Sequence, residues 1–244
     1  MPERPEPFIE GLIPTLNQRG FMSERLNYFS TQFAEYAGTL DSEGLDMGCA
    51  YGIASRAALE NGARVLACDM DERHLQILKQ ETPKELRARL RTAVGVLPDV
   101  DFPDASFGAI HCSRVLHFLL SDEIRASLAR MYRWLMPGGR LFLVADTPYT
   151  GFWFATAPEY ERRKAEGDEW PGFIEDVSLL FESGKCPRGM LPYLNPMDPD
   201  ILSRESRRAG FVIETAEFIG RDGNREGRHH AGLIASKPDV ANSA

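Results

Sequence analysis

The stretch LDMGCAYG (45–52) decides the fold of this 244-residue chain. An apolar run ends in an acid, Asp46, and small residues then occupy alternate positions, Gly48, Ala50 and Gly52, before a predicted helix. Small residues let the backbone approach a ligand closely, and the N-terminus of a helix offers free N–H groups. The stretch therefore predicts a strand, a tight turn and a helix, with a ligand site at the turn.

Outward from this turn, strand and helix patterns alternate along the chain. Predicted strands cover 43–47, 64–69, 91–96, 107–112 and 140–146, and predicted helices cover 53–60, 72–80, 121–135 and 198–209. The sequence PGG (137–139) predicts a turn into the strand 140–146, and the segments 211–220 and 229–237 predict a closing antiparallel hairpin. Apolar strands that alternate with helices are typical of a parallel sheet covered on both faces, which binds ligands at the carboxyl ends of its strands.

Two segments fall outside this alternation. The first 20 residues carry four prolines and predict an extended arm, followed by a helix that is capped by Ser23 and runs to about Ala37. The segment 147–196 is rich in aromatic residues, Pro and Gly, which form either its own small core or a cover over a bound molecule. We expect a sheet domain over 39–146 and 197–237, a lid built from 1–38 and 147–196, and a tail over 238–244.

Composition and charge exclude several classes of protein. The chain is 43% hydrophobic and 26% charged, as in ordinary globular proteins, and its net charge of −8 makes a nucleic-acid partner a poor first hypothesis. No apolar run approaches the roughly 18 residues that span a bilayer. The N-terminus lacks the apolar core of a signal peptide, so we expect a soluble, cytoplasmic protein with no membrane partner. The four cysteines, which lack CxxC spacing, predict free thiols and no metal site: Cys49, Cys68, Cys112 and Cys186.

The acids at two strand ends indicate the kind of ligand. Asp69 closes the second strand, where an acid can bind the hydroxyls of a ribose. A dinucleotide fingerprint would require glycines at positions 48, 50 and 53, whereas the chain has Ala50 and Ile53. A pyrophosphate is therefore disfavoured, and the acid before Gly48 suits a cationic ligand that carries an amine.

With these residues the chain resembles the class I S-adenosylmethionine-dependent methyltransferases. The resemblance rests on LDMGCAYG, ACDMD (67–71), the run 94–119, LMPGGRLFLV (135–144) and MDPDILSRESRRAGF (197–211). It implies a Rossmann-like, doubly wound α/β sheet of seven strands, mostly parallel with a terminal antiparallel hairpin, and a helical lid. It also implies S-adenosylmethionine as cofactor, with S-adenosylhomocysteine as its product.

The resemblance assigns cofactor contacts to particular positions. Asp69 would hold the ribose and Met70 would pack on the adenine, while the remaining contacts would come from Asp46, Gly48, Ala50, Gly52, Val96, Leu97, Cys112 and Ser113. Two positions depart from the family pattern, because Val96 replaces an acid that bonds the adenine amine and Gly108 replaces an Asp. The adenine would then be held by backbone groups and apolar contact, or by Asp99 or Asp101.

The resemblance further implies methyl transfer to an oxygen, carbon or amine nucleophile of a small, apolar or aromatic metabolite. His117 is the first candidate for a base, with Asp146 and Tyr149 as further candidates, whereas His111 within a strand is predicted to be structural. Two alternatives remain, a protein that binds the cofactor without transferring a methyl group and a methyltransferase acting on a protein or RNA. The sequence leaves the acceptor and the oligomeric state open.

Overall fold

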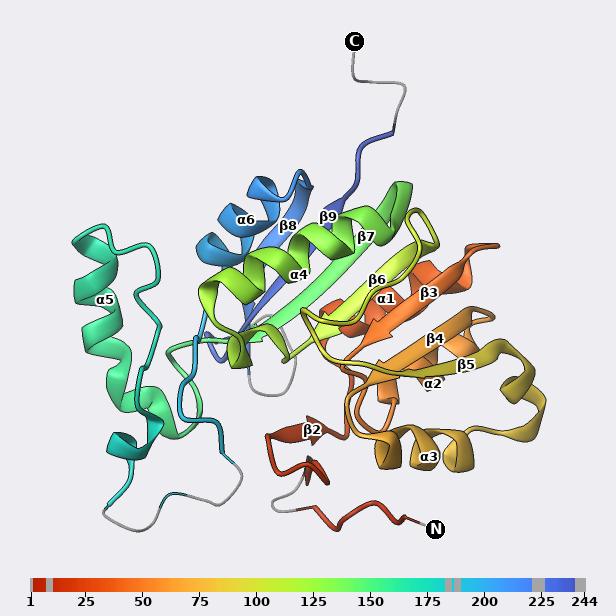
Figure 1. Cartoon of the computed structure of the whole chain (residues 1–244), viewed down its shortest axis with the longest axis horizontal. Coiled ribbons are helices and arrows are strands. Elements are labelled where there is room, and N and C mark those ends of the chain that lie inside the picture. Colours follow the sequence, from red (N-terminus) through yellow and green to blue (C-terminus); the bar gives the residue numbers. More distant parts are fainter. Residues whose placement is uncertain (1, 8–10, 183–185, 187–189, 221–226, 240–244) are drawn as a thin grey trace.

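The computed structural model describes residues 2–7, 11–182, 186, 190–220 and 227–239, and a seven-stranded sheet forms its centre (Figure 1). The strands are β3 (Glu43–Met47), β4 (Arg64–Asp69), β5 (Leu90–Val94), β6 (Phe107–Ser113), β7 (Leu135–Asp146), β8 (Val212–Ile219) and β9 (His230–Ser236). Their order is β5-β4-β3-β6-β7-β9-β8, with β9 antiparallel to both of its neighbours and all other pairs parallel. The predicted fold class is confirmed, including the terminal antiparallel hairpin.

Helices cover both faces of the sheet. These helices are α1 (Tyr28–Gly38), α2 (Ile53–Glu60), α3 (Glu72–Glu81), α4 (Ser121–Trp134) and α6 (Pro199–Arg208), whereas α5 (Ala157–Ala165) belongs to the segment 147–196 and lies to one side of the sheet (Figure 1). Successive side chains of β7 point to opposite faces, as the period of a strand requires. Leu141 and Leu143 join the core that includes α4 and α6, whereas Phe142 and Val144 join the core that includes α1 and α2. None of the helices in the described part of the chain is both long and apolar enough to cross a membrane.

The N-terminal segment differs from the predicted extended arm. The strands β1 (Leu12–Pro14) and β2 (Phe21–Ser23) pair as a short antiparallel hairpin, so Ser23 ends a strand instead of capping a helix. The helix α1 begins only at Tyr28, and its cap is Asn27, whose Oδ1 accepts a hydrogen bond from the Ser30 backbone N–H at 3.0 Å. The predicted cap was wrong because pairing between the two short strands outweighs the local preference of Ser23 for a helix end.

The predicted turn at PGG (137–139) lies inside β7. The strand begins at Leu135 and pairs with Phe107, and the pairing then shifts until Arg140 lies opposite Ala109. Gly138 takes up the irregularity with a φ of +73°, which a residue with a Cβ adopts at a cost. The predicted interruption of regular structure at PGG is therefore present, but it forms a bulge within β7 and does not separate a helix from a strand.

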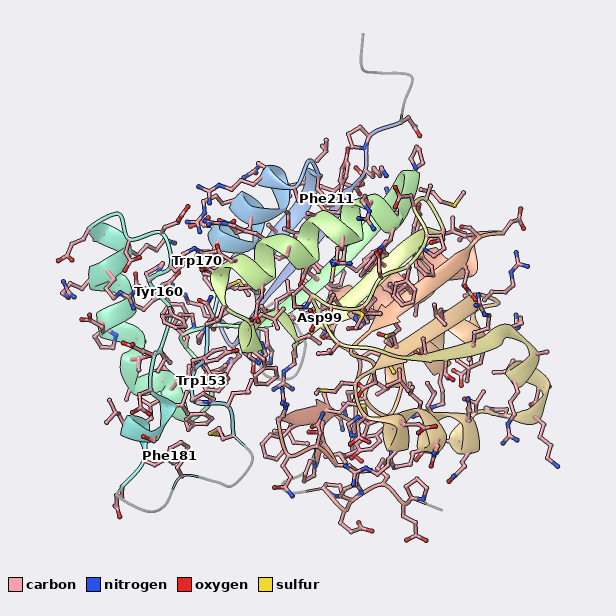
Figure 2. The ribbon with its side chains drawn as sticks, in the orientation of Figure 1. Asp99, Trp153, Tyr160, Trp170, Phe181 and Phe211 are labelled. Atoms are coloured by element: carbon pink, nitrogen blue, oxygen red, sulfur yellow. The ribbon has the colours of Figure 1, made fainter. Side chains whose placement is uncertain are left out.

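The segment 147–196 packs around aromatic side chains of its own (Figure 2). It contains α5 and two short 3₁₀ helices, Gly151–Thr156 and Val177–Leu180, and Ile174 and Leu194 form an isolated bridge. Trp153, Val177 and Leu194 are its buried centre, against which Phe118 of the sheet domain packs.

A buried carboxylate at the end of β7 joins three parts of the sheet. Asp146 is 2% exposed, and its oxygens accept hydrogen bonds from Arg114 at 2.8 and 3.2 Å and lie 2.8 Å from His230 Nδ1. Burial alone would raise the pKa of Asp146, but Arg114 and the neighbouring histidines hold it well below its usual value. His117 Nε2 lies 3.7 Å from the same carboxylate and has no hydrogen-bond partner among the described residues.

Burial lowers the pKa of His117 to about 4, which makes the stability of the fold depend on pH. The unfolded chain binds this proton near pH 6.5, whereas the folded protein binds it only near pH 4. The contribution is complete above about pH 6.5 and is lost as the pH falls toward 4, because the unfolded state then binds more protons.

We expect the His117→Gln variant to lose less unfolding free energy than the parent between neutral pH and about pH 4, by on the order of 3 kcal/mol. Urea unfolding of both proteins across this range measures the difference. Parallel curves for the two proteins would contradict the assignment.

Candidate functional site

A cavity opens at the carboxyl ends of β3, β4 and β6, beside the point where the strand order reverses. It encloses about 1170 Å³ of empty space when its open mouth is included. The turn after β3 forms its floor, and the β1–β2 hairpin with the start of α1 covers it from above. This is the position at which doubly wound sheets bind ligands.

The turn after β3 brings the backbone close to the cavity. Gly48 has a φ of +72°, and a Cβ there would lie 2.3 Å from the side chain of Val115. Ala50 also has a positive φ of 45°, at a cost of roughly 1–2 kcal/mol, and its N–H donates a hydrogen bond to Asp69 at 2.8 Å. Gly48 and Ala50 line the cavity, whereas Gly52 starts α2 and faces Leu78 outside it.

Asp46 lies on the cavity floor in a chain of buried hydrogen bonds. Ser55 donates its hydroxyl to Oδ2 at 2.5 Å, and His111 Nδ1 lies 2.8 Å from Oδ1. Because the carboxylate needs a donor, Nδ1 carries the proton and Nε2 accepts from the Ser30 hydroxyl at 2.9 Å. The ring of His111 stacks on Phe33 with 4.9 Å between centroids.

Sequence reasoning left His111 out of the site. Its ring lines the cavity, together with Ser30 and Asp46. The signal that could have found it is register, since His111 lies directly opposite Asp46 in the β3–β6 pair. A histidine that lies in an otherwise apolar strand and opposite a buried acid is better interpreted as a hydrogen-bond partner of that acid than as a residue of the apolar core.

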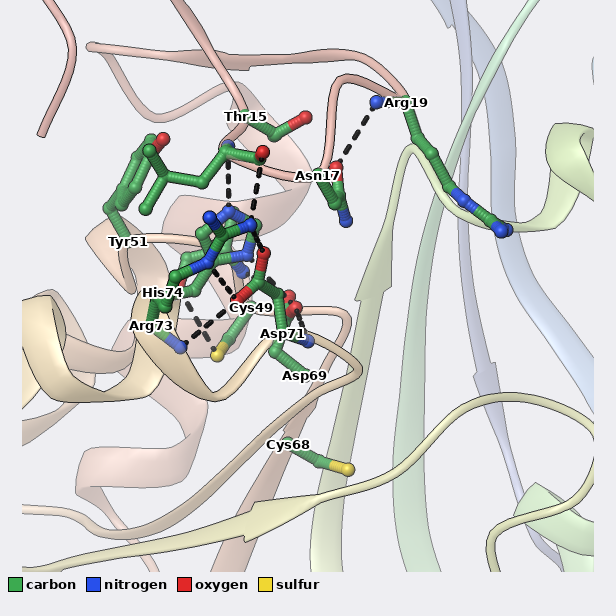
Figure 3. A network of polar contacts seen from close by, with 12 residues as sticks. Thr15, Asn17, Arg19, Cys49, Tyr51, Cys68, Asp69, Asp71, Arg73 and His74 are labelled. Carbon is green, nitrogen blue, oxygen red and sulfur yellow. Dashed lines mark hydrogen bonds and ion pairs between the residues drawn. The ribbon is translucent and has the colours of Figure 1, made fainter. Parts of the chain in front are cut away.

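Asp69 lies at the neighbouring strand end and connects the floor to the cover (Figure 3). Its Oδ1 accepts from the Asp71 backbone N–H and from His74 Nδ1, both at 2.9 Å. His74 Nε2 in turn accepts the backbone N–H of Leu16 at 3.0 Å, which fixes the proton of the ring on Nδ1. Arg73 also donates to the Leu16 carbonyl at 3.1 Å, so the hairpin is held beside the acid.

The walls near Asp69 are apolar. Met70 and Val96 line the cavity and remain 38% and 39% exposed, although both are large hydrophobic residues. Leu97 and Ser113 also line it. Neither Asp99 nor Asp101 does, and Asp101 accepts a hydrogen bond from the Trp134 indole at 2.9 Å instead.

Cys112 does not reach the cavity. It is fully buried in the core between β6 and α4, and burial raises the pKa of its thiol. Burial likewise raises the pKa of Cys68 to about 12. Such thiols are protonated at neutral pH, which is typical of structural cysteines. Among the described residues, no cluster of His, Cys, Asp or Glu is arranged to hold a metal ion.

The three candidate bases lie behind the cavity wall. Neither His117 nor Asp146 nor Tyr149 lines the cavity in the described part of the chain. Tyr149 donates its hydroxyl to Glu161, and Arg228 lies 3.6 Å above its ring. A role as base stays a prediction for each of the three. The placement of Asp146 favours a positioning role, since its carboxylate orients Arg114, which does line the cavity.

The cover of the cavity comes from the N-terminal hairpin. No described residue of 147–196 lines the cavity. The segment contacts two residues that do: Phe118 packs against its buried centre, and the Leu119 carbonyl accepts a hydrogen bond from the Asn195 side chain at 3.5 Å. Residues 183–185 and 187–189 of the predicted lid lie outside the described residues.

Comparison with known proteins agrees with this geometry. Residues 45–143 match the family model of the methyltransferase domain. The chain is 35% identical over 106 residues to a cypemycin N-terminal methyltransferase of Streptomyces sp., covering 43% of this chain and 42% of that protein. It is also 35% identical over 105 residues to a demethylmenaquinone methyltransferase of Tropheryma whipplei, covering 42% of this chain and 41% of that protein. The alignments thus span less than half the length of these curated relatives.

Solved structures show the same fold at low sequence identity. A 1,6-didemethyltoxoflavin-N1-methyltransferase of Burkholderia thailandensis with bound S-adenosylhomocysteine superimposes with a TM-score of 0.57 at 18% identity, over 87% of this chain and 80% of that one. A methyltransferase of Methanosarcina mazei gives 0.60 at 18% identity, over 82% and 93%. The chain therefore carries, over residues 45–143, a methyltransferase domain of the class I S-adenosylmethionine-dependent family.

Proposed function

We propose that the protein binds S-adenosylmethionine in the cavity and transfers its methyl group to a small molecule that enters beside the hairpin. The observation that carries this proposal is the placement of Asp46, Gly48 and Asp69 around one cavity, at the ends of two adjacent strands. Each lies at the position that the resemblance assigns to a cofactor contact.

The residues present fit the cofactor. Asp69 Oδ2 accepts one hydrogen bond, from Ala50, so it retains a lone pair for a ribose hydroxyl. Met70 and Val96 would be covered by the adenine, which accounts for two large apolar side chains left exposed in a cavity. Asp46, held in place by His111 and Ser55, offers its remaining lone pairs to the cofactor's ammonium group.

The bound cofactor supplies an electrophilic methyl group, and this chain supplies orientation and exclusion of water. The hairpin closes the cavity from above, and the contact of His74 with Leu16 holds it there. An acceptor that must lose a proton would find Ser30 and His111 at the cavity surface, with Asp46 to stabilise the imidazolium.

The acceptor side of the cavity supports a small, partly apolar molecule. Phe21, Val115, Phe118 and Leu119 line this side. The net charge of −8 disfavours RNA as acceptor. The first alternative is that the chain binds the cofactor but transfers no methyl group, so that it is a binding protein and not an enzyme. The second alternative is a methyltransferase whose acceptor is another protein.

The direct test measures binding and turnover separately. Calorimetry with S-adenosylhomocysteine should show binding, and incubation with S-adenosylmethionine and a panel of phenols, amines and acids should give a product heavier by one methyl group replacing hydrogen. Binding with no product over the whole panel would favour the binding-protein alternative. No binding of either cofactor form would overturn the proposal.

We expect Asp69→Asn to weaken S-adenosylhomocysteine binding by about 5- to 150-fold, because it removes a hydrogen bond to a charged group worth about 1–3 kcal/mol. Asp122→Asn is the matched control, because Asp122 is 94% exposed on α4 and lies outside the cavity. Calorimetry of the three proteins measures the effect. Equal affinity of the Asp69 variant and the parent would remove Asp69 from the ribose site.

A further inference from the structure

Two arginines on the cover of the cavity have no charged partner among the residues that the structure describes. Arg19 and Arg25 line the cavity, and both are exposed. The hydrogen bonds that they donate come from their backbone N–H groups, to Asn17 and to Ser23, and their guanidinium groups contact no acid of the described chain. Resting on the proposed function, we propose that Arg19 and Arg25 bind an anionic group, a carboxylate or a phosphate, of the methyl acceptor.

The other charged side chains of the cavity wall already have hydrogen-bond or ion-pair partners. Asp46 is bonded to His111 and Ser55, and Asp69 to His74 and two backbone N–H groups. Arg114, the third arginine of the wall, forms its ion pair with the buried Asp146. Arg19 and Arg25 are therefore the charged side chains of the described wall that lack a hydrogen-bond or ion-pair partner, although the chain as a whole carries −8.

The position of Arg19 places this charge at the acceptor side. Its neighbour Gly20 lies against Phe118, so closely that a Cβ on Gly20 would be 3.2 Å from the ring. The Phe21 carbonyl accepts a hydrogen bond from Arg114 at 3.2 Å. The turn of the hairpin thus rests on the connection between β6 and α4, and Figure 3 shows the Arg19 side chain pointing away from the network of Asp69 and His74.

Charge balance explains why an anion fits there. Within the described wall, the guanidinium groups of Arg19 and Arg25 balance the carboxylates of Asp46 and Asp69. Bound S-adenosylmethionine would bring a sulfonium, an ammonium and one carboxylate, so the loaded cavity would carry net positive charge. A guanidinium binds carboxylate or phosphate with two parallel hydrogen bonds. The neighbouring Phe21 and Phe118 would contact the apolar part of the same molecule.

The test uses matched probes on the protein saturated with S-adenosylhomocysteine. Calorimetry compares benzoate and phenyl phosphate with neutral benzamide. We expect the anions to bind more tightly than benzamide, and Arg19→Met or Arg25→Met to weaken their binding by roughly five- to tenfold while benzamide binding stays unchanged. Arg207→Met is the control, because Arg207 is exposed on α6 and outside the cavity.

The cofactor's own carboxylate is the competing source of the anion, and a second comparison separates the two. 5′-Methylthioadenosine lacks the carboxylate of S-adenosylhomocysteine. If the arginine variants weaken binding of S-adenosylhomocysteine but not of 5′-methylthioadenosine, and leave benzoate binding unchanged, the arginines bind the cofactor and the proposal is overturned. Benzoate binding no tighter than benzamide overturns it as well. Failure of the proposed function has a different signature, the absence of S-adenosylhomocysteine binding, and the benzoate comparison is then made on the protein alone.

Discussion

The carboxylate of Asp69 is the interaction on which the cavity depends. It accepts the N–H of Ala50 and thereby holds the turn after β3 in its left-handed conformation. It accepts the N–H of Asp71 at the start of α3, and through His74 it reaches the backbone of Leu16 in the hairpin. Floor, side wall and cover thus converge on one acid that is 5% exposed. A ligand bound to Asp69 therefore contacts the group to which the floor and the side wall are hydrogen-bonded directly and the cover through His74.

The same arrangement recurs at the ends of three strands. Asp46, Asp69 and Asp146 end or nearly end β3, β4 and β7, and each is buried beside a histidine: His111, His74 and His230. Burying a carboxylate is costly unless donors surround it, and an imidazole supplies one without a second permanent charge. Each acid at the carboxyl edge of the sheet is thus hydrogen-bonded although it is buried. The guanidinium groups of Arg19 and Arg25, on the cover, oppose the charge of Asp46 and Asp69.

The two segments outside the sheet differ in their relation to the cavity. The short β1–β2 hairpin packs its buried residues Ile13 and Met22 in one cluster with Tyr51 and Ile77. Hydrogen bonds to His74, Tyr51 and Arg114 hold it as well. The segment 147–196 is larger and has its own buried centre around Trp153, which contacts the cavity wall at Phe118 without lining the cavity in the described part of the chain. Of these two segments, the hairpin and not 147–196 is therefore the one whose described residues line the cavity.

The sequence by itself determined the α/β class, the closing hairpin and the turn at Gly48, because strand periodicity, apolar runs and small residues after an acid are local patterns. It also placed Asp69 correctly at a strand end. Only the tertiary structure decided that His111 joins Asp46 across 65 residues of sequence, that His74 joins Leu16 across 58, and that His117 and Asp146 lie behind the wall. Such contacts depend on register and on which segment covers which edge. These are set by packing between distant elements, and no local pattern records them.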